Sequence, residues 1–242
     1  MSASERRQSV RTGVVWNVVS DLLGTAGTGG AAPARIVDVG GGTGGFAVPL
    51  AELGHKVLVI DPSPDALAAL DRRARERGVA DLVRGQQGDL SDVTDLVSEV
   101  DLVLCHGVLD VVEDPAAGLA RAAEALRPGG HLSLLVGQRH AAVLARAMAG
   151  QFAQAQALLD PDAEPGRSGR RFTHDEITAL LLGAGFTVEQ VHGVRVFADL
   201  VPGALLDAEA GSTQALVDLE RAVAGRPEFF PLAAQLHLLA VR

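Results

Sequence analysis

Short apolar runs alternate with helical periodicity through the middle of the chain. The continuous apolar runs are residues 35–39, 56–60, 101–105 and 131–136. The stretches with helical spacing between them are 44–53, 64–77 and 115–126, and a weaker strand and short helix are expected at 81–87 and 91–98. Strands that are apolar throughout are typical of a parallel sheet covered by helices on both faces. The pattern therefore predicts an α/β fold.

The pattern changes towards both ends of the chain. Residues 4–24 have a partial apolar stripe and predict a helix, which a glycine-rich linker follows up to residue 34. Beyond residue 137 we expect helices at 139–159, 174–184 and 212–224, and strands at 185–197, with a bulge at Gly193, and at 232–241. We expect a single domain over 1–242, with 1–34 as N-terminal helix and linker and 138–172 as a helical insertion that forms a lid.

Composition and charge narrow the class of protein. The 242 residues are 48% hydrophobic and 21% charged, as in ordinary globular domains. A formal net charge of −9 gives no global positive field for DNA or an anionic membrane, although a local basic patch stays open. The single cysteine, Cys105, forms no intramolecular disulfide, and the sequence has neither a signal-peptide pattern nor an apolar run of about 20 residues. We expect a cytoplasmic protein.

The glycine-rich segment 38–46, "DVGGGTGGF", follows the first predicted strand. It matches the G-x-G-x-x-G fingerprint of dinucleotide-binding proteins and also a second pattern, an acid followed by alternating glycines. Asp61 follows the second predicted strand, where a carboxylate accepts hydrogen bonds from both hydroxyl groups of a ribose or caps the helix that begins at 63–64. Both nucleotide interpretations use this acid, so Asp61 does not separate them.

Other residues favour the second pattern. Asp38 stands inside the first strand, where a buried carboxylate needs a cationic partner such as a ligand ammonium and would repel a pyrophosphate. Asp89 ends the third strand, placed to accept from an adenine amino group. His106 follows the fourth strand at the edge where α/β proteins bind ligands, and "LRPGG" (126–130) leads into the fifth strand.

Together these motifs resemble the class I S-adenosylmethionine-dependent methyltransferases. The resemblance implies a Rossmann-like sheet of seven strands with the last antiparallel, S-adenosyl-L-methionine as cofactor and S-adenosyl-L-homocysteine as product. The seven histidines and one cysteine show no ligand spacing for zinc, so we expect no metal. It implies cofactor-binding roles for Arg11, Asp38, Gly40, Gly41, Gly42, Gly44, Asp61, Pro62, Gly88, Asp89, Leu90 and His106.

A longer resemblance extends to the tRNA 5-carboxymethoxyuridine methyltransferases, which esterify a wobble-uridine carboxylate. It rests on "VRTGVVW" (10–16), "HGVLDVVEDP" (106–115), "AGQFAQAQA" (149–157) and "GVRVFADL" (193–200). It implies that Arg11 holds the cofactor carboxylate, against the alternative of a solvated helix residue. The chain departs from that group in a shorter N-terminal segment, in "DPDAEPGRSGRR" (160–171) where the group is lysine-rich, and at Ala198 and Leu200.

Two residues are candidates for the catalytic site. His106 lines the cofactor or substrate, or acts as a base; a carboxylate acceptor is already an anion near pH 7 and needs no base. Arg195 binds an anionic acceptor through its planar fork or is a surface arginine. The acceptor alternatives are a tRNA wobble carboxylate and a small metabolite, and a cofactor-binding protein without turnover or a nicotinamide-dependent protein are further rivals. The oligomeric state is not readable from the sequence.

Overall fold

The computed structural model describes residues 3–24, 32–160, 169–202, 205–206 and 211–242, with side chains of the first helix described from residue 13 onwards. Its strands form one seven-stranded sheet in the order β3-β2-β1-β4-β5-β7-β6. The strands are β1 (Arg35–Val39), β2 (Lys56–Asp61), β3 (Val83–Gln87), β4 (Val100–His106), β5 (Leu126–Gly137), β6 (Thr187–Val194) and β7 (Gln235–Val241). All neighbouring strands pair in parallel except β7, which is antiparallel to β5 and β6. The predicted α/β sheet with a last antiparallel strand is confirmed.

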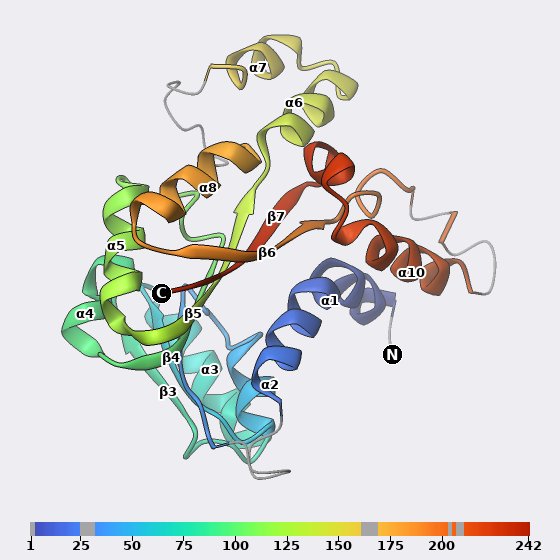
Figure 1. Ribbon diagram of the computed structural model, residues 1–242. Coiled ribbons are helices and arrows are strands. Elements are labelled where there is room, and N and C mark those ends of the chain that lie inside the picture. Colours follow the sequence, from blue (N-terminus) through green and yellow to red (C-terminus); the bar gives the residue numbers. More distant parts are fainter. Residues whose placement is uncertain (1–2, 25–31, 161–168, 203–204, 207–210) are drawn as a thin grey trace.

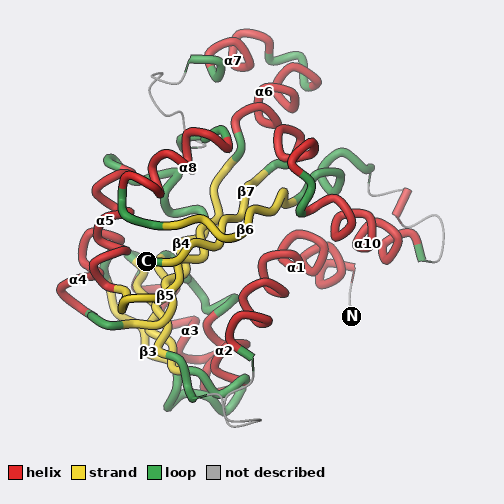
Figure 2. Tube along the Cα trace, viewed as in Figure 1, coloured by secondary structure: helices red, strands yellow, loops and turns green. Residues whose placement is uncertain are grey.

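Helices cover both faces of the sheet (Figure 1). The helices are α1 (Ala3–Leu23), α2 (Ala47–Glu52), α3 (Pro64–Glu76), α4 (Val93–Leu96), α5 (Pro115–Ala125), α6 (Arg139–Met148), α7 (Phe152–Ala157), α8 (His174–Gly183) and α10 (Ser212–Ala224), with short 3₁₀ turns η1 (Leu90–Asp92) and η2 (Pro227–Leu232). One large apolar core joins α1, α2 and α3 to one face of the sheet, and a second joins α5 and α8 to the opposite face. A smaller third cluster is formed by Val196, Val223 and Ala233. In Figure 2 the helices α6 and α7 stand apart from these layers, beyond one edge of the sheet.

Local sequence signals fix where several helices begin. Ser63 caps α3, since its side chain accepts a hydrogen bond from the Ala66 N–H, and Pro64 occupies the first helical position. Thr173 and Glu176 form the predicted reciprocal capping box at the start of α8. These signals are confirmed because each depends only on residues within one turn.

The structure corrects two predictions near β6. The irregular register lies between Val188 and Gln190, so the bulge expected at Gly193 was wrong; Gly193 pairs regularly with Leu236. The strand also ends at Val194 rather than at residue 197. Arg195 therefore leaves the sheet, with a left-handed φ of 60°. The predicted helix 139–159 is divided into α6 and α7, and Gly150 adopts a φ of 73° between them.

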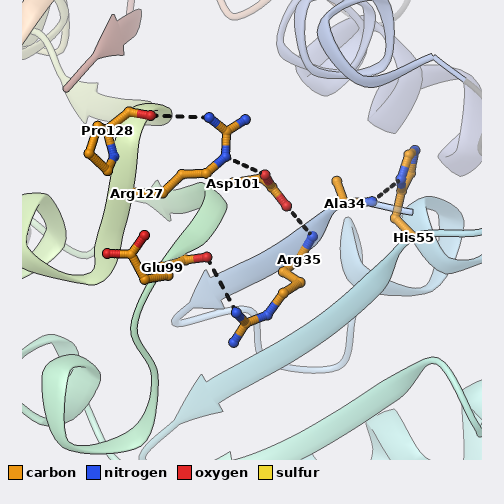
Figure 3. A network of polar contacts seen from close by, with 7 residues as sticks. All are labelled: Ala34, Arg35, His55, Glu99, Asp101, Arg127 and Pro128. Carbon is orange, nitrogen blue, oxygen red and sulfur yellow. Dashed lines mark hydrogen bonds and ion pairs between the residues drawn. The ribbon is translucent and has the colours of Figure 1, made fainter. Parts of the chain in front are cut away.

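A polar network joins the amino-terminal ends of β1, β4 and β5 (Figure 3). The Asp101 carboxylate accepts from the Arg35 backbone N–H at 2.8 Å and from Nε of Arg127 at 2.6 Å. Burial acts to raise the pKa of Asp101, but these hydrogen bonds and the two arginine charges outweigh it and hold that pKa below its ordinary value. The network connects the strands at the amino-terminal edge of the sheet, and the candidate site lies at the opposite, carboxyl-terminal edge.

Candidate functional site

The glycine-rich loop joins β1 to α2 at the carboxyl-terminal edge of the sheet. Gly40, Gly42 and Gly44 adopt positive φ angles of 66°, 55° and 80°. A Cβ atom at Gly44 would lie 2.3 Å from Cδ1 of Leu70, so the loop packs closely on α3. The Gly40 N–H donates to the Ile60 carbonyl at 2.7 Å, which ties the loop to β2. Because β1 and β4 are the strands at which the strand order reverses, this loop borders the crevice where open α/β sheets bind ligands.

Asp38 lies directly beneath this loop. Its side chain is buried and receives no hydrogen bond or ion pair from any residue that the structure describes. Burial, together with the negative charge of Asp61, raises the pKa of Asp38 from 3.8 to about 7. No described residue compensates this buried carboxylate, and a cationic ligand group would do so.

Asp61 at the end of β2 connects the loop to the start of α3. Its Oδ2 accepts from the Gly42 N–H and its Oδ1 from the Ser63 N–H, each at 2.9 Å. The helix cap itself is Ser63, so Asp61 supports the turn without capping α3. The carbonyl of the adjacent Pro62 accepts from Nε2 of Gln87 on β3 at 3.2 Å. These contacts bring Asp61 and the glycine loop together, as predicted for a ribose site, and leave that role a prediction.

The turn after β3 holds the third group of predicted cofactor residues. Asp89 is exposed, and its Oδ1 accepts from the N–H and the hydroxyl group of Ser91. These hydrogen bonds hold the pKa of Asp89 below its ordinary value, so it is an anion at neutral pH. The Gly88 N–H donates to the Asp61 carbonyl at 3.3 Å. The side chain of Leu90 is buried in the core, where its Cδ2 lies close to Gly118 of α5.

His106 ends β4 and belongs to a buried polar network that sequence reasoning missed. Its Nε2 is hydrogen-bonded at 2.9 Å to Oγ of Ser133, which is bonded at 2.8 Å to Nε2 of His237. The His106 ring also packs edge-on against Phe46, with centroids 4.8 Å apart. Burial lowers the pKa of His106 to about 4, so the imidazole is neutral near pH 7 and a weak base.

The sheet register explains this network. His106 pairs with Leu135, Leu135 with His237, and His237 with His192, so the three imidazoles lie in one row on one face of four neighbouring strands. The rings of His192 and His237 stack with centroids 5.7 Å apart. Burial lowers the pKa of His192 and His237 as well. His237 is a lone polar residue in the apolar run "LHLLAV", which is the signal that could have revealed it.

A cavity of about 970 Å³ opens at the same edge, beside the ends of β5, β6 and β7. Its walls include α6, α7 and the segment leading into α8. Arginines dominate its charged lining, and two aspartates accompany them: Arg139, Arg146, Arg170, Arg171, Arg195, Asp160 and Asp199. The predicted acceptor residue Arg195 therefore faces a cavity that also has four further guanidinium groups.

The arginines of this cavity differ in how far the protein neutralises them. Arg139 pairs with Glu176 at 2.6 Å, and Arg195 pairs with Asp199. Arg171 lies 3.6 Å from the buried carboxylate of Asp110. Arg170 has no ion pair with any described residue, and its Nε is buried without a hydrogen-bond partner.

Asp110 holds the two consecutive arginines in place. Its backbone carbonyl accepts from the Arg170 N–H at 2.6 Å, and its carboxylate accepts from the Gly137 N–H at 3.1 Å. A Cβ atom at Gly169 would lie 2.6 Å from the same carbonyl, so this approach requires glycine. Asp110 thus attaches the segment before α8 to the ends of β4 and β5.

Three further expectations concern Arg11, metal ions and the membrane. Arg11 lies in α1, its side chain is outside the described residues, and its role at the cofactor carboxylate stays a prediction. Within the described ranges, no group of three or more His, Cys, Asp or Glu side chains is arranged to hold a metal ion. None of the described helices is both long and apolar enough to span a bilayer.

The chain is similar in sequence and fold to known methyltransferases. Residues 37–132 match a family model described as a methyltransferase domain. The chain is 29% identical over 238 residues to the tRNA 5-carboxymethoxyuridine methyltransferase of Escherichia coli K12, covering 96% of this chain and 87% of that protein. It is 34% identical over 172 residues to a ubiquinone biosynthesis O-methyltransferase of Xanthomonas euvesicatoria, and the match covers 67% of this chain and 66% of that protein. Magnesium protoporphyrin IX methyltransferase from Synechocystis PCC 6803, solved with bound S-adenosylhomocysteine, superposes with a TM-score of 0.62 at 18% identity, covering 98% and 83% of the chains.

Proposed function

We propose that this protein methylates an anionic acceptor. The premise is that the chain belongs to the class I S-adenosylmethionine-dependent methyltransferases and uses S-adenosyl-L-methionine as its cofactor. The acceptor that we favour is the carboxylate of a tRNA wobble 5-carboxymethoxyuridine. A tRNA acceptor would place the enzyme in the cytoplasm. The observation that carries the proposal is the arginine-lined cavity, in which Arg170 lacks an ion pair with any described residue.

The residues at the glycine loop fit the cofactor. The carboxylate of Asp38, which no described residue compensates, would hold the cofactor's ammonium group. Asp61 would bind its ribose hydroxyls and Asp89 its adenine amino group. The backbone of Gly40, Gly41, Gly42 and Gly44 would form the close-packed floor beneath it, and Pro62, Gly88 and Leu90 would complete the adenosine side. Bound S-adenosylmethionine supplies an electrophilic methyl group on a sulfonium sulfur.

The protein's own part in the reaction is to bind and align the acceptor. A carboxylate is ionised near pH 7 and already carries the attacking electron pair, so no base is needed. Arg170 and Arg195 would fix its position, and alignment and exclusion of water supply the rate enhancement. His106, neutral because burial lowers its pKa, would line the space between cofactor and acceptor. The helices α6 and α7 would form the lid over it.

A small metabolite is the second candidate acceptor. The net charge of −9 and the aspartates among the cavity arginines disfavour long contacts with a polyanion such as tRNA. The likeness to the tRNA-modifying relative over 96% of this chain favours tRNA. Both acceptors use the same anion-binding arginines.

Labelled methyl transfer tests the proposal. The purified protein is incubated with S-adenosylmethionine labelled in its methyl group. One set of reactions contains tRNA from an Escherichia coli strain that lacks its tRNA 5-carboxymethoxyuridine methyltransferase, and a second set contains a panel of carboxylate metabolites. We expect transfer to the tRNA, and Arg170→Met should raise the acceptor KM by about 10- to 100-fold without changing S-adenosylhomocysteine affinity. The control Arg72→Met removes an exposed arginine on α3 and should change neither value. Transfer only to a metabolite would establish the second candidate, and transfer to no anionic acceptor would refute the proposal.

A further inference from the structure

A buried carboxylate in α10 is bonded to three consecutive backbone amides of the turn after β6. Glu220 is 2% exposed. Its Oε2 accepts from the Val196 N–H at 2.9 Å, and its Oε1 accepts from the Phe197 N–H at 2.8 Å and the Ala198 N–H at 2.7 Å. The structure records no ion pair between Glu220 and a described cation. Successive amides that converge on one anion form a backbone nest, and here the nest offsets the cost of burying the charge.

The turn held by this carboxylate begins with Arg195. That residue has a φ of 60°, a left-handed conformation that costs free energy for any residue with a Cβ atom. Such a conformation persists only where surrounding contacts hold it. Val196, packed with Val223 of α10 and Ala233, is 1% exposed, and the Arg195 carbonyl accepts from the Ala234 N–H at 3.2 Å.

The side chain of Arg195 points away from these contacts and towards the cavity. Its guanidinium group contacts Asp199 and donates to Oε1 of Gln235 at 3.4 Å, and both of those residues line the cavity. Glu220 is not among the lining residues. It touches the site only through the backbone of the turn that presents Arg195.

We propose that Glu220 is a positioning residue, which holds residues 195–198 in the strained conformation that directs the Arg195 guanidinium into the acceptor cavity. The role of Arg195 in acceptor binding rests on the function proposed above. The hold of Glu220 on the turn does not, so the two can be tested separately.

A stability comparison tests the hold on the turn without any acceptor. Alanine and glycine at position 195 both lack the guanidinium, and they differ mainly in the cost of a left-handed φ. With Glu220 present, we expect Arg195→Gly to melt about 2–4 °C above Arg195→Ala. In the Glu220→Gln background the turn can relax, and this difference should vanish or reverse. The same difference in both backgrounds would overturn the proposal.

Controls keep this comparison decisive. Glu228→Gln removes an exposed carboxylate in η2 and should leave the glycine–alanine difference intact. If Glu220→Gln does not fold, Glu220→Asp carries the same comparison, because its carboxylate is one methylene shorter and should reduce the difference.

Kinetics with the deletion-strain tRNA then test the consequence for the acceptor. Glu220→Gln should raise the acceptor KM about 10-fold, with kcat and S-adenosylhomocysteine affinity within about twofold. It should have no further effect on KM in an Arg195→Ala background. An equal KM increase in that background, or a KM that does not change in Glu220→Gln, would overturn the positioning role. A wild-type protein that methylates none of the anionic acceptors would contradict the proposed function, while the melting comparison would still decide the hold on the turn.

Discussion

Replacing Asp38 by asparagine should make the free protein more stable and the cofactor complex weaker. The carboxylate is buried without a hydrogen-bond partner among the described residues, and burial and the Asp61 charge raise its pKa from 3.8 to about 7. Asparagine keeps the shape and removes the charge. Opposite effects on stability and binding are expected of a group kept for a cationic ligand, and a merely structural residue would not show them.

The stability effect follows from proton linkage. The folded chain holds the Asp38 proton up to about pH 7 and the unfolded chain only to about pH 4, so the contribution of this group to stability is lost as pH rises from 4 to 7. A shift of about three pKa units corresponds to at most about 4 kcal/mol. Asp38→Asn should therefore gain up to about 4 kcal/mol over wild type above pH 7, and this gain should disappear below about pH 4. Urea unfolding at several pH values measures it.

The binding effect has the opposite sign. The ligand ammonium pairs with the ionised form of Asp38, which makes up about nine tenths of the group at pH 8 and about one tenth at pH 6. Wild-type affinity for S-adenosylhomocysteine should therefore be about 10-fold weaker at pH 6 than at pH 8 by calorimetry. Asp38→Asn should bind about 10- to 100-fold more weakly at pH 8 and lose this pH dependence. Asp95→Asn, which removes an exposed carboxylate in α4, is the charge-matched control. A wild-type affinity that does not vary between pH 6 and 8, or an Asp38→Asn variant that binds normally, would refute the reasoning.

Three further substitutions have defined outcomes. Gly41→Ala would place a Cβ atom 2.5 Å from Oδ2 of Asp38, so calorimetry should show at least about 10-fold weaker S-adenosylhomocysteine binding, and normal affinity would count against the predicted contact. Ser133→Ala leaves the Nε2 atoms of His106 and His237 without their shared partner and should destabilise the fold by about 1–3 kcal/mol in urea, whereas an unchanged midpoint would contradict the network. Asp101→Asn should lower stability at pH 7 and not at pH 2, because the pKa of this carboxyl is depressed and its contribution is lost as pH falls through the folded value; an equal loss at both pH values would exclude that cause.

The part of the structure around the glycine-rich loop, from β1 to the turn after β3, could be predicted from the sequence because its signals are local. Apolar strands, Ser63 before Pro64 and the glycines after β1 each specify their own conformation within a few residues. Parallel strands then bring Asp38, Asp61 and Asp89 to one edge whatever the rest of the chain does. The number of strands and the antiparallel last strand came from the resemblance to a known family.

The arrangement of residues around the arginine-lined cavity could not be predicted, because it depends on contacts between residues that are distant in the sequence. Arg195 was expected within a strand, but it adopts a left-handed φ at the start of a turn. The next three backbone amides of that turn donate to Glu220, which lies 25 positions after Arg195. The link from His106 through Ser133 to His237 needs the register of β4, β5 and β7, which no periodicity encodes. An isolated polar residue in an apolar run, such as His237, is a signal in the sequence that could have pointed to such a partner.

The chemical stability of the transferred methyl group tests the central claim most directly. Product labelled from S-adenosylmethionine is treated with mild alkali, which hydrolyses a methyl ester to a carboxylate and methanol and leaves N-methyl, C-methyl and ether groups intact. We predict that the label is released as volatile methanol, because the cavity arginines would bind and align a carboxylate. Label that stays on the acceptor after this treatment would contradict carboxylate methylation.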